Sequence, residues 1–121
     1  MTFAGEDLAA LAADEEIEIE TRAPSGVTHR TIIWVMVDAD RVFIRSVNGE
    51  SARWYREATA DPSVAVHVQG WRLPVRLVPA TDDASIQACN AALRRKYRGD
   101  GSLRSMLQAH TLPTTLQVMP T

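Results

Sequence analysis

Between positions 30 and 54 the sequence gathers side chains that could bind a phosphate or another small anion. Gly49 permits a positive φ and a close approach of the backbone to a ligand, and Ser51 is a suitable N-cap for a helix predicted at 51–60. The free N–H groups at the beginning of a helix attract phosphate. We therefore expect an anion-binding site built from six residues of this stretch, namely Arg45, Ser46, Asn48, Gly49, Ser51 and Arg53.

Each of these arginines has an alternative explanation as a solvated or ion-paired surface residue, and only their occurrence beside Gly49 and Ser51 favours an anion site. Trp34 could stack on the ring of a ligand, although an aromatic residue in an apolar strand is more often part of the core. The three histidines lie far apart without a metal-binding spacing, so we expect no metal site. His67 on a strand could donate a proton near a bound ring, or could serve the structure alone.

Composition narrows the class of protein. A chain of 121 residues, 45% hydrophobic, fits one domain over 1–121, with 1–14 as a helical arm. No apolar segment reaches the roughly 18 residues that span a bilayer, and the N-terminus is acidic, so we expect a cytoplasmic protein without membrane contact. Cys89 is the only cysteine and is expected to be a buried, inert thiol.

Charge is unevenly distributed along the sequence. Residues 1–20 contain seven acidic side chains and no basic one, whereas the remainder contains 13 basic and 8 acidic side chains. The arginines are scattered through predicted strands rather than gathered in one run. This pattern favours a small anionic ligand over a nucleic acid.

Hydrophobic periodicity predicts a mainly β (α+β) protein. Alternation and apolar runs indicate strands over 15–21, 31–37, 41–47, 64–69, 71–77 and 112–119, with helices over 5–14, 51–60 and 82–97. Pro74 suggests a sheet edge or a bulge. The run 31–37 is apolar on both faces, which predicts a strand covered on both sides and, together with three tryptophans in a short chain, a homodimer.

The order strand, strand, Arg45-Ser46-x-x-Gly49-x-Ser51-x-Arg53-Trp54, Asp61-Pro62, strand, strand resembles the flavin-binding split β-barrel superfamily. That superfamily includes pyridoxamine-phosphate oxidases and deazaflavin-dependent nitroreductases. The patterns Thr31-x-x-Trp34, Arg45-Ser46-x-x-Gly49 and Trp54-Tyr55 are most similar to DUF2255, a small family of unknown function. The resemblance extends from about Ile17 to Met119.

This resemblance implies a six-stranded split β-barrel with flanking helices that forms a homodimer and holds FMN, or the deazaflavin F420, at the dimer interface. It adds Arg30, Trp34 and Trp54 to the expected cofactor-binding residues, since Arg30 matches the first residue of the R-x-V-L-L-K pattern of the oxidases. The lysine of that pattern is Val35 here, which cannot contact a phosphate.

Two classes of function stay open. One is an oxidoreductase that uses FMN or F420 to reduce a small organic substrate, since such a cofactor carries the hydride and the protein supplies binding and orientation. The other is a non-catalytic ligand-binding protein or a dimeric interaction module, because fold alone does not assign function.

Overall fold

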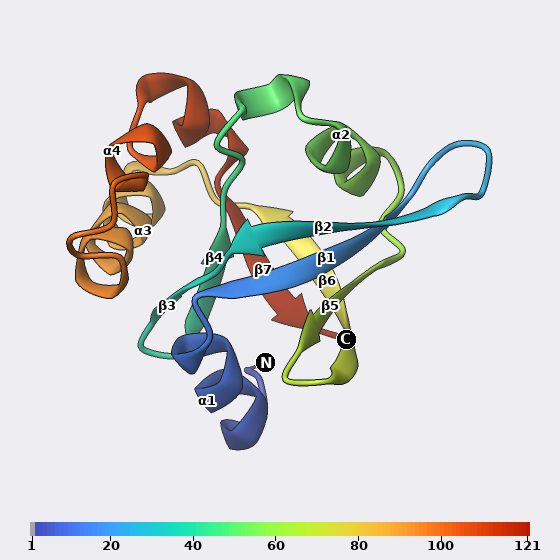
Figure 1. The fold of residues 1–121 in the computed structure, drawn as a ribbon, viewed down its shortest axis with the longest axis horizontal. Helices are drawn as coiled ribbons and strands as arrows, with labels where there is room; N and C mark the ends of the chain where they lie inside the picture. Colours follow the sequence, from blue (N-terminus) through green and yellow to red (C-terminus); the bar gives the residue numbers. More distant parts are fainter. Residues whose placement is uncertain (1) are drawn as a thin grey trace.

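The computed structural model describes residues 2–121, in which an antiparallel sheet curls around a hydrophobic core (Figure 1). The strands are β1 (Glu16–Arg22), β2 (Thr28–Trp34), β3 (Met36–Asp38), β4 (Arg41–Ile44), β5 (Val64–Val68), β6 (Trp71–Pro79) and β7 (Leu116–Pro120). Their order in the sheet is β2-β1-β5-β6-β7-β4-β3. The predicted class, a mainly β split barrel with flanking helices, is confirmed.

The strand count differs from the six predicted because the run 31–37 is divided at Val35. Its amide donates to the Tyr97 hydroxyl at 3.2 Å, and its carbonyl accepts from Lys96 Nζ at 2.8 Å, so side chains replace ladder partners at this residue. The two pieces, β2 and β3, form opposite edges of the sheet although a single residue separates them. One bent segment therefore contributes to both edges, which brings the sheet close to a closed barrel.

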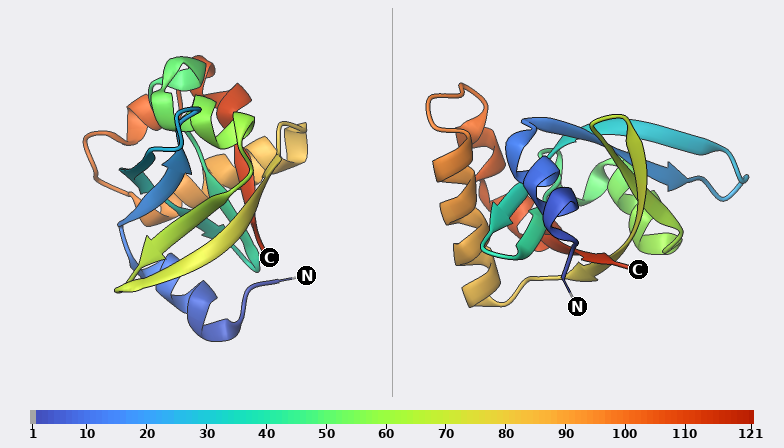
Figure 2. Two further views of the ribbon diagram at one scale, coloured as in Figure 1. Left: turned by 90° about the vertical axis from the view of Figure 1, so that its right-hand side faces the viewer. Right: turned by 90° about the horizontal axis from the view of Figure 1, so that it is seen from below.

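Helices cover the barrel at several places. The longer ones are α1 (Gly5–Ala13), α2 (Arg53–Ala60) and α3 (Asp83–Lys96), and α4 (Leu103–Met106) is a single turn. Figure 2 shows α3 along one side of the barrel, where a second hydrophobic cluster that includes Phe43, Cys89 and Leu93 joins it to β3 and β4. Within residues 2–121, none of the helices is long and apolar enough to cross a membrane.

Local signals explain several element boundaries. Asp82 caps α3 by accepting from the Ser85 amide at 3.1 Å, as its position before a helical pattern indicates. Gln69 and Gly70 both have positive φ, which suits the two-residue turn between β5 and β6. Pro74 lies in the half of β6 that pairs with β5 alone, so it occupies a local edge although β6 is an inner strand.

Several boundaries differ from the sequence predictions, and the strand predicted over 41–47 ends at Ile44. The helix predicted at 51–60 is a 3₁₀ turn, η1 (Gly49–Ser51), followed by α2, whose N-cap is Ala52 without a side-chain hydrogen bond. Ser51 therefore does not cap a helix, and its hydroxyl instead donates to the Asn48 carbonyl at 3.0 Å. The strand predicted at 112–119 begins only at Leu116, because a 3₁₀ segment, η2 (Ala109–Thr114), precedes it.

Candidate functional site

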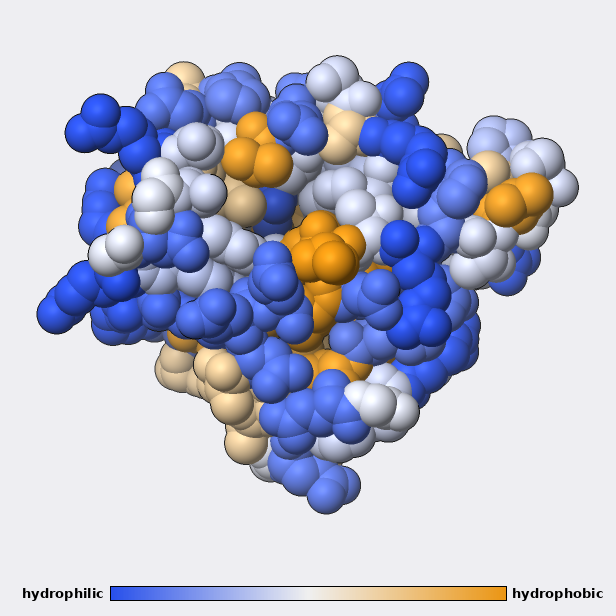
Figure 3. All heavy atoms as spheres, in the orientation of Figure 1, coloured by the Kyte–Doolittle hydropathy of each residue, from blue (hydrophilic) through white to orange (hydrophobic). Residues whose placement is uncertain are grey.

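A hollow of about 330 Å³ lies where the end of β2 meets the segment that follows β4. The face that carries this part of the molecule is drawn in Figure 3, where hydrophobic residues flank a depression. The hollow, called here the Arg45 hollow, is lined by Glu16, Thr31, Ile32, Ile33, Trp34, Arg45, Val47, Asn48, Trp54, Ser102, Ser105 and Met106. Its volume falls at the lower end of the range for small-molecule sites.

Arg45 is the most unusual side chain in this hollow because it is a charged residue with 1% relative exposure. Its Nε donates to Thr115 Oγ1 at 2.9 Å, and its Nη1 donates to Asn90 Oδ1 at 2.8 Å and to the Met106 carbonyl at 3.2 Å. The third nitrogen, Nη2, is buried and has no hydrogen-bond partner. The guanidinium is therefore fixed in place with one of its three nitrogens unused.

The positive charge of Arg45 is also uncompensated. Within the described residues it takes part in no ion pair, and its three hydrogen-bond acceptors are all neutral oxygens. Burial lowers the pKa of Arg45, and it raises the pKa of the nearby Cys89 thiol to about 11, so Cys89 stays neutral and supplies no counter-charge. A buried cation without an anion is costly, and an anionic ligand in the hollow would remove that cost.

Two indole rings, those of Trp34 and Trp54, also line the hollow. Trp34 stacks on Tyr97 with ring centroids 3.8 Å apart and planes 5° from parallel, so its orientation is fixed by the C-cap residue of α3. Trp54 is 7% exposed and belongs to the barrel core. Trp34 is half-buried and also lines the hollow. It can therefore be a core residue, a residue that stacks on a ligand, or both. Rings beside a buried guanidinium suit a planar ligand that carries an anionic group.

Of the nine residues expected to bind a cofactor, four line the Arg45 hollow: Trp34, Arg45, Asn48 and Trp54. The other five have different surroundings. Ser46 is buried, with its amide donating to Thr114 Oγ1 at 2.9 Å and its hydroxyl unpartnered. Ser51 bonds within its own turn.

Gly49 and Arg53 also have local explanations. A Cβ at Gly49 would lie 3.1 Å from the His110 carbonyl oxygen, so the glycine, with φ of +72°, serves the packing of η1 on η2. Arg53 is directed to Glu57, at 3.9 Å, and to Thr31 Oγ1, at 3.4 Å, and does not line the hollow.

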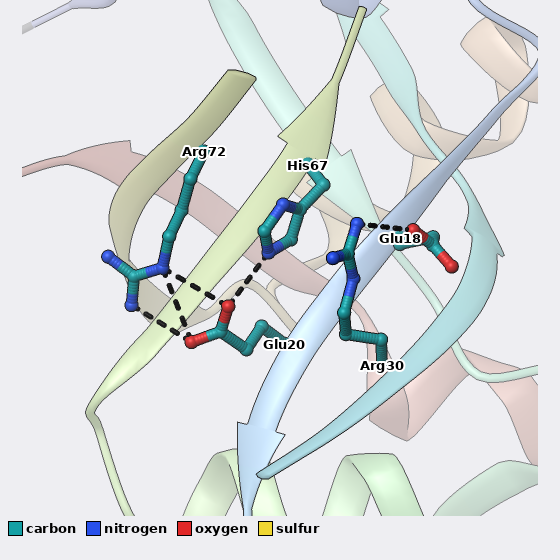
Figure 4. Close-up of polar contacts among 5 residues, drawn as sticks. All are labelled: Glu18, Glu20, Arg30, His67 and Arg72. Atoms are coloured by element: carbon teal, nitrogen blue, oxygen red, sulfur yellow. Dashed lines mark hydrogen bonds and ion pairs between the residues drawn. The ribbon is translucent and has the colours of Figure 1, made fainter. Parts of the chain in front are cut away.

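Arg30 lies on the outer face of β2, where its Nη2 donates to Glu18 Oε1 at 2.7 Å (Figure 4). On the same face Glu20 accepts from Arg72 at 2.9 Å and lies 2.7 Å from His67 Nε2. These bonds from Arg72 and His67 lower the pKa of Glu20 to about 2. Arg30 and His67 are thus members of an ion-pair surface rather than of the hollow.

Sequence reasoning missed the contribution of α4 to the hollow. Ser102, Ser105 and Met106 come from a segment more than fifty residues beyond Arg45, and they line the hollow because Arg45 bonds the Met106 carbonyl. The sequence signals here are weak, since a Gly-Asp-Gly-Ser turn predicts a surface loop and gives no partner for it. Within the same described part of the chain, no group of three His, Cys, Asp or Glu side chains is arranged to hold a metal ion.

The fold is similar to those of several solved structures. An F420 reductase superposes with a TM-score of 0.60 at 20% identity, covering 93% of this chain and 91% of that chain. A putative pyridoxamine 5'-phosphate oxidase from Listeria innocua gives 0.61 at 12% identity, covering 93% and 87%. HutZ, the heme storage protein from Vibrio cholerae, gives 0.65 at 10% identity, covering 100% and 92%. At such identities the similarity establishes the fold alone.

A search of curated proteins found no match to the sequence. A family model does match, over residues 7–118, and it describes an uncharacterized protein conserved in bacteria, DUF2255. The match covers both edges of the barrel, the Arg45 hollow and α3. The chain therefore belongs to the DUF2255 family.

Proposed function

We propose that the Arg45 hollow binds the phosphate-bearing part of a flavin or deazaflavin, FMN or F420, and that the loaded protein reduces a small organic substrate. The observation that carries this proposal is the buried, uncompensated guanidinium of Arg45 with its unpartnered Nη2. A phosphate would supply both the missing negative charge and the missing acceptor. Similarity of fold to an F420 reductase and to a putative pyridoxamine 5'-phosphate oxidase supports this choice of ligand.

The residues of the hollow fit parts of such a cofactor. Arg45, Asn48 and the hydroxyl groups of Ser102 and Ser105 would hold the phosphate and its polar chain, while Trp34 would lie against a ring. Val35 occupies the place of the oxidase lysine, so in this chain the positive charge would come from Arg45 instead. When bound in its reduced form, such a cofactor would supply the hydride, and the residues of the hollow would orient it and exclude water.

A second copy of the chain would complete this site. Ile32 and Val47 line the hollow yet are 61% and 40% exposed, which is unusual for large apolar side chains at the rim of one cavity. A volume of about 330 Å³ also leaves little room for a whole flavin. We therefore place the hollow at a homodimer interface that covers Ile32 and extends the cavity.

Titration of the purified protein with FMN, F420 and hemin, followed by absorbance and fluorescence, tests the ligand. We expect FMN or F420 to bind, and Arg45→Met to weaken that binding by about 10- to 100-fold, the scale of a charge-assisted hydrogen bond. Arg53→Ala is the matched control, because Arg53 comes from the same stretch but does not line the hollow. Arg45→Lys, which keeps the charge, should retain more affinity than Arg45→Met.

Thermal melts of each variant separate a binding defect from a folding defect. Equal affinity of the parent and a folded Arg45→Met variant would contradict the proposal, as would binding of hemin in place of both flavins. Single-turnover oxidation of the reduced cofactor by model quinones or nitro compounds then distinguishes an enzyme from a carrier. If none of FMN, F420 and hemin binds, the result would favour the dimeric interaction module.

A further inference from the structure

A second cavity lies on the other side of α2, under the tip of the β1–β2 hairpin, which projects beside α2 in Figure 1. This hairpin groove has a volume of about 630 Å³. The hairpin contributes Arg22 and an apolar wall that includes Pro24, and α2 contributes Arg53, Arg56 and Glu57. It shares no lining residue with the Arg45 hollow.

The floor of the hairpin groove is fixed by Glu57, which is held by two side chains of the β1–β2 hairpin. Its carboxylate accepts from Thr21 Oγ1 at 2.8 Å, and both of its oxygens lie 3.1 Å from His29 Nδ1. Burial, to 8% exposure, raises the pKa of Glu57, but the bonds to Thr21 and His29 outweigh it and hold the pKa below its usual value. Glu57 is therefore ionised and ties α2 to the hairpin.

Arg53 is oriented by this floor, and the other two arginines are free. The Arg53 Nε lies 3.9 Å from Glu57 Oε2, and the Arg53 Nη2 lies 3.4 Å from Thr31 Oγ1. Arg22 and Arg56 make no side-chain hydrogen bond or ion pair with residues 2–121, although both line the same groove. Two guanidinium groups from separate elements thus face a common ligand space without partners.

The charge of the groove selects the kind of ligand. Three guanidinium groups against the carboxylates of Glu57 and Asp61 leave one net positive charge among the lining residues. A single negative charge matches that surplus, whereas a dianion would meet two nearby carboxylates. Arginine binds a carboxylate through two parallel N–H groups, and the walls at Ala23, Pro24 and Ala60 can pack on an apolar body.

We propose that the hairpin groove is a binding site for a small organic carboxylate with an apolar or aromatic body, held by Arg22 and Arg56 across the groove. Binding at this site requires no cofactor. Arg53 borders the groove while contacting Thr31, which lines the Arg45 hollow, so the carboxylate would bind next to that hollow.

Amide NMR titration with benzoate as the probe tests this site, with benzamide as the uncharged analogue. We expect benzoate to shift the resonances of Gly26, Arg56 and Ala60 at millimolar concentration, and benzamide to shift them less. Arg56→Gln should weaken benzoate binding about fivefold, the scale of an exposed ion pair. Arg98→Gln, which removes another exposed arginine outside the groove, should leave binding unchanged.

Equal shifts with benzamide, or unchanged affinity in a folded Arg56→Gln variant, would overturn the proposal. Tighter binding of phenyl phosphate than of benzoate would overturn the choice of a monoanion. Shifts at Trp34 and Asn48 in place of the groove would assign the probe to the Arg45 hollow and remove the evidence for a second site. Because no cofactor is added, failure here leaves the flavin proposal unaffected.

Discussion

At the scale of single residues, buried charges fall into two kinds. Glu57 is surrounded by donors that match its carboxylate, so it stabilises the contact of α2 with the hairpin. Arg45 has only neutral acceptors and an unused nitrogen, so its burial is not balanced within residues 2–121. A buried charge with matching partners, as at Glu57, stabilises the fold. A buried charge without a counter-charge, as at Arg45, is typical of a binding site.

Glu20 makes a pH-dependent contribution to stability. Its pKa is lowered from 4.5 to about 2 by hydrogen bonds from Arg72 and then His67 (Figure 4). Since the unfolded state binds the proton first, the contribution is fully present above about pH 4.5 and is lost as the pH falls toward 2. We expect Glu20→Gln to destabilise the protein at neutral pH and to match the parent near pH 2.

Urea unfolding of both proteins from pH 7 to pH 2 measures this difference. Glu6→Gln is the control, because Glu6 is exposed and makes no ion pair with the described residues. A constant difference between parent and Glu20→Gln across this range would show that the carboxylate charge is not what Arg72 and His67 recognise.

Gly49 gives a test of the packing between η1 and η2. Alanine at this position would adopt a positive φ and bring Cβ within 3.1 Å of the His110 carbonyl oxygen. We expect Gly49→Ala to lower the free energy of unfolding by about 1–3 kcal/mol. Thermal melts of the variants measure this loss. Gly101→Ala, whose Cβ would meet nothing within 4 Å, should leave the stability unchanged in the same experiment. Equal stabilities of the two variants would contradict this account.

At the scale of elements, the break between β2 and β3 depends on the C-terminal end of α3, where Lys96 and the C-cap Tyr97 bond to Val35. The Tyr97 hydroxyl accepts from the Val35 amide at 3.2 Å and donates to the Glu15 carbonyl at 2.6 Å, so Tyr97→Phe leaves the buried Val35 amide without this acceptor and removes the donor to Glu15. We expect a loss of about 1–3 kcal/mol and faster hydrogen exchange at the Val35 amide. Tyr55→Phe is the control, since the Tyr55 hydroxyl makes no hydrogen bond within the described chain. Unchanged exchange at Val35 would assign the break to the backbone alone.

The elements also show which predictions a sequence can support. Alternation identified β1 and β5, and the Asp82 cap identified α3, because these signals are local. The break at Val35 and the place of α4 in the hollow depend on contacts more than sixty residues apart, between Val35 and Tyr97 and between Arg45 and Met106. The prediction that Arg53 contacts a phosphate rests on the same local reasoning, which contains no information on Glu57, 3.9 Å from the Arg53 Nε.

At the scale of the whole molecule, the Arg45 hollow and the hairpin groove lie on either side of α2 and differ in chemistry. The Arg45 hollow opens where β2 and the segment after β4 approach, and the hairpin groove opens where the hairpin extends past β5. Arg53 and Thr31 lie between them. A cofactor in the first and a carboxylate in the second would therefore be neighbours within one chain, while the dimer interface would cover the hollow from outside.

Ile32 provides the test of that dimer. Its side chain is 61% exposed and faces outward opposite Glu18, so Ile32→Lys places a lysine on an exposed surface beside the Glu18–Arg30 ion pair and should not impair folding. In a two-fold dimer the same change would bury a lysine from each copy near the interface, which is strongly unfavourable.

We expect the parent to sediment as a dimer at micromolar concentration, and Ile32→Lys to sediment as a monomer with an unchanged melting profile at low concentration. The variant should also lose affinity for FMN or F420 by at least tenfold, because half of the cavity is missing. Val78→Lys is the control, since Val78 is 37% exposed but lies on β6 away from the hollow. A monomeric parent, or a dimer that survives Ile32→Lys, would place the interface elsewhere and leave the hollow open to solvent.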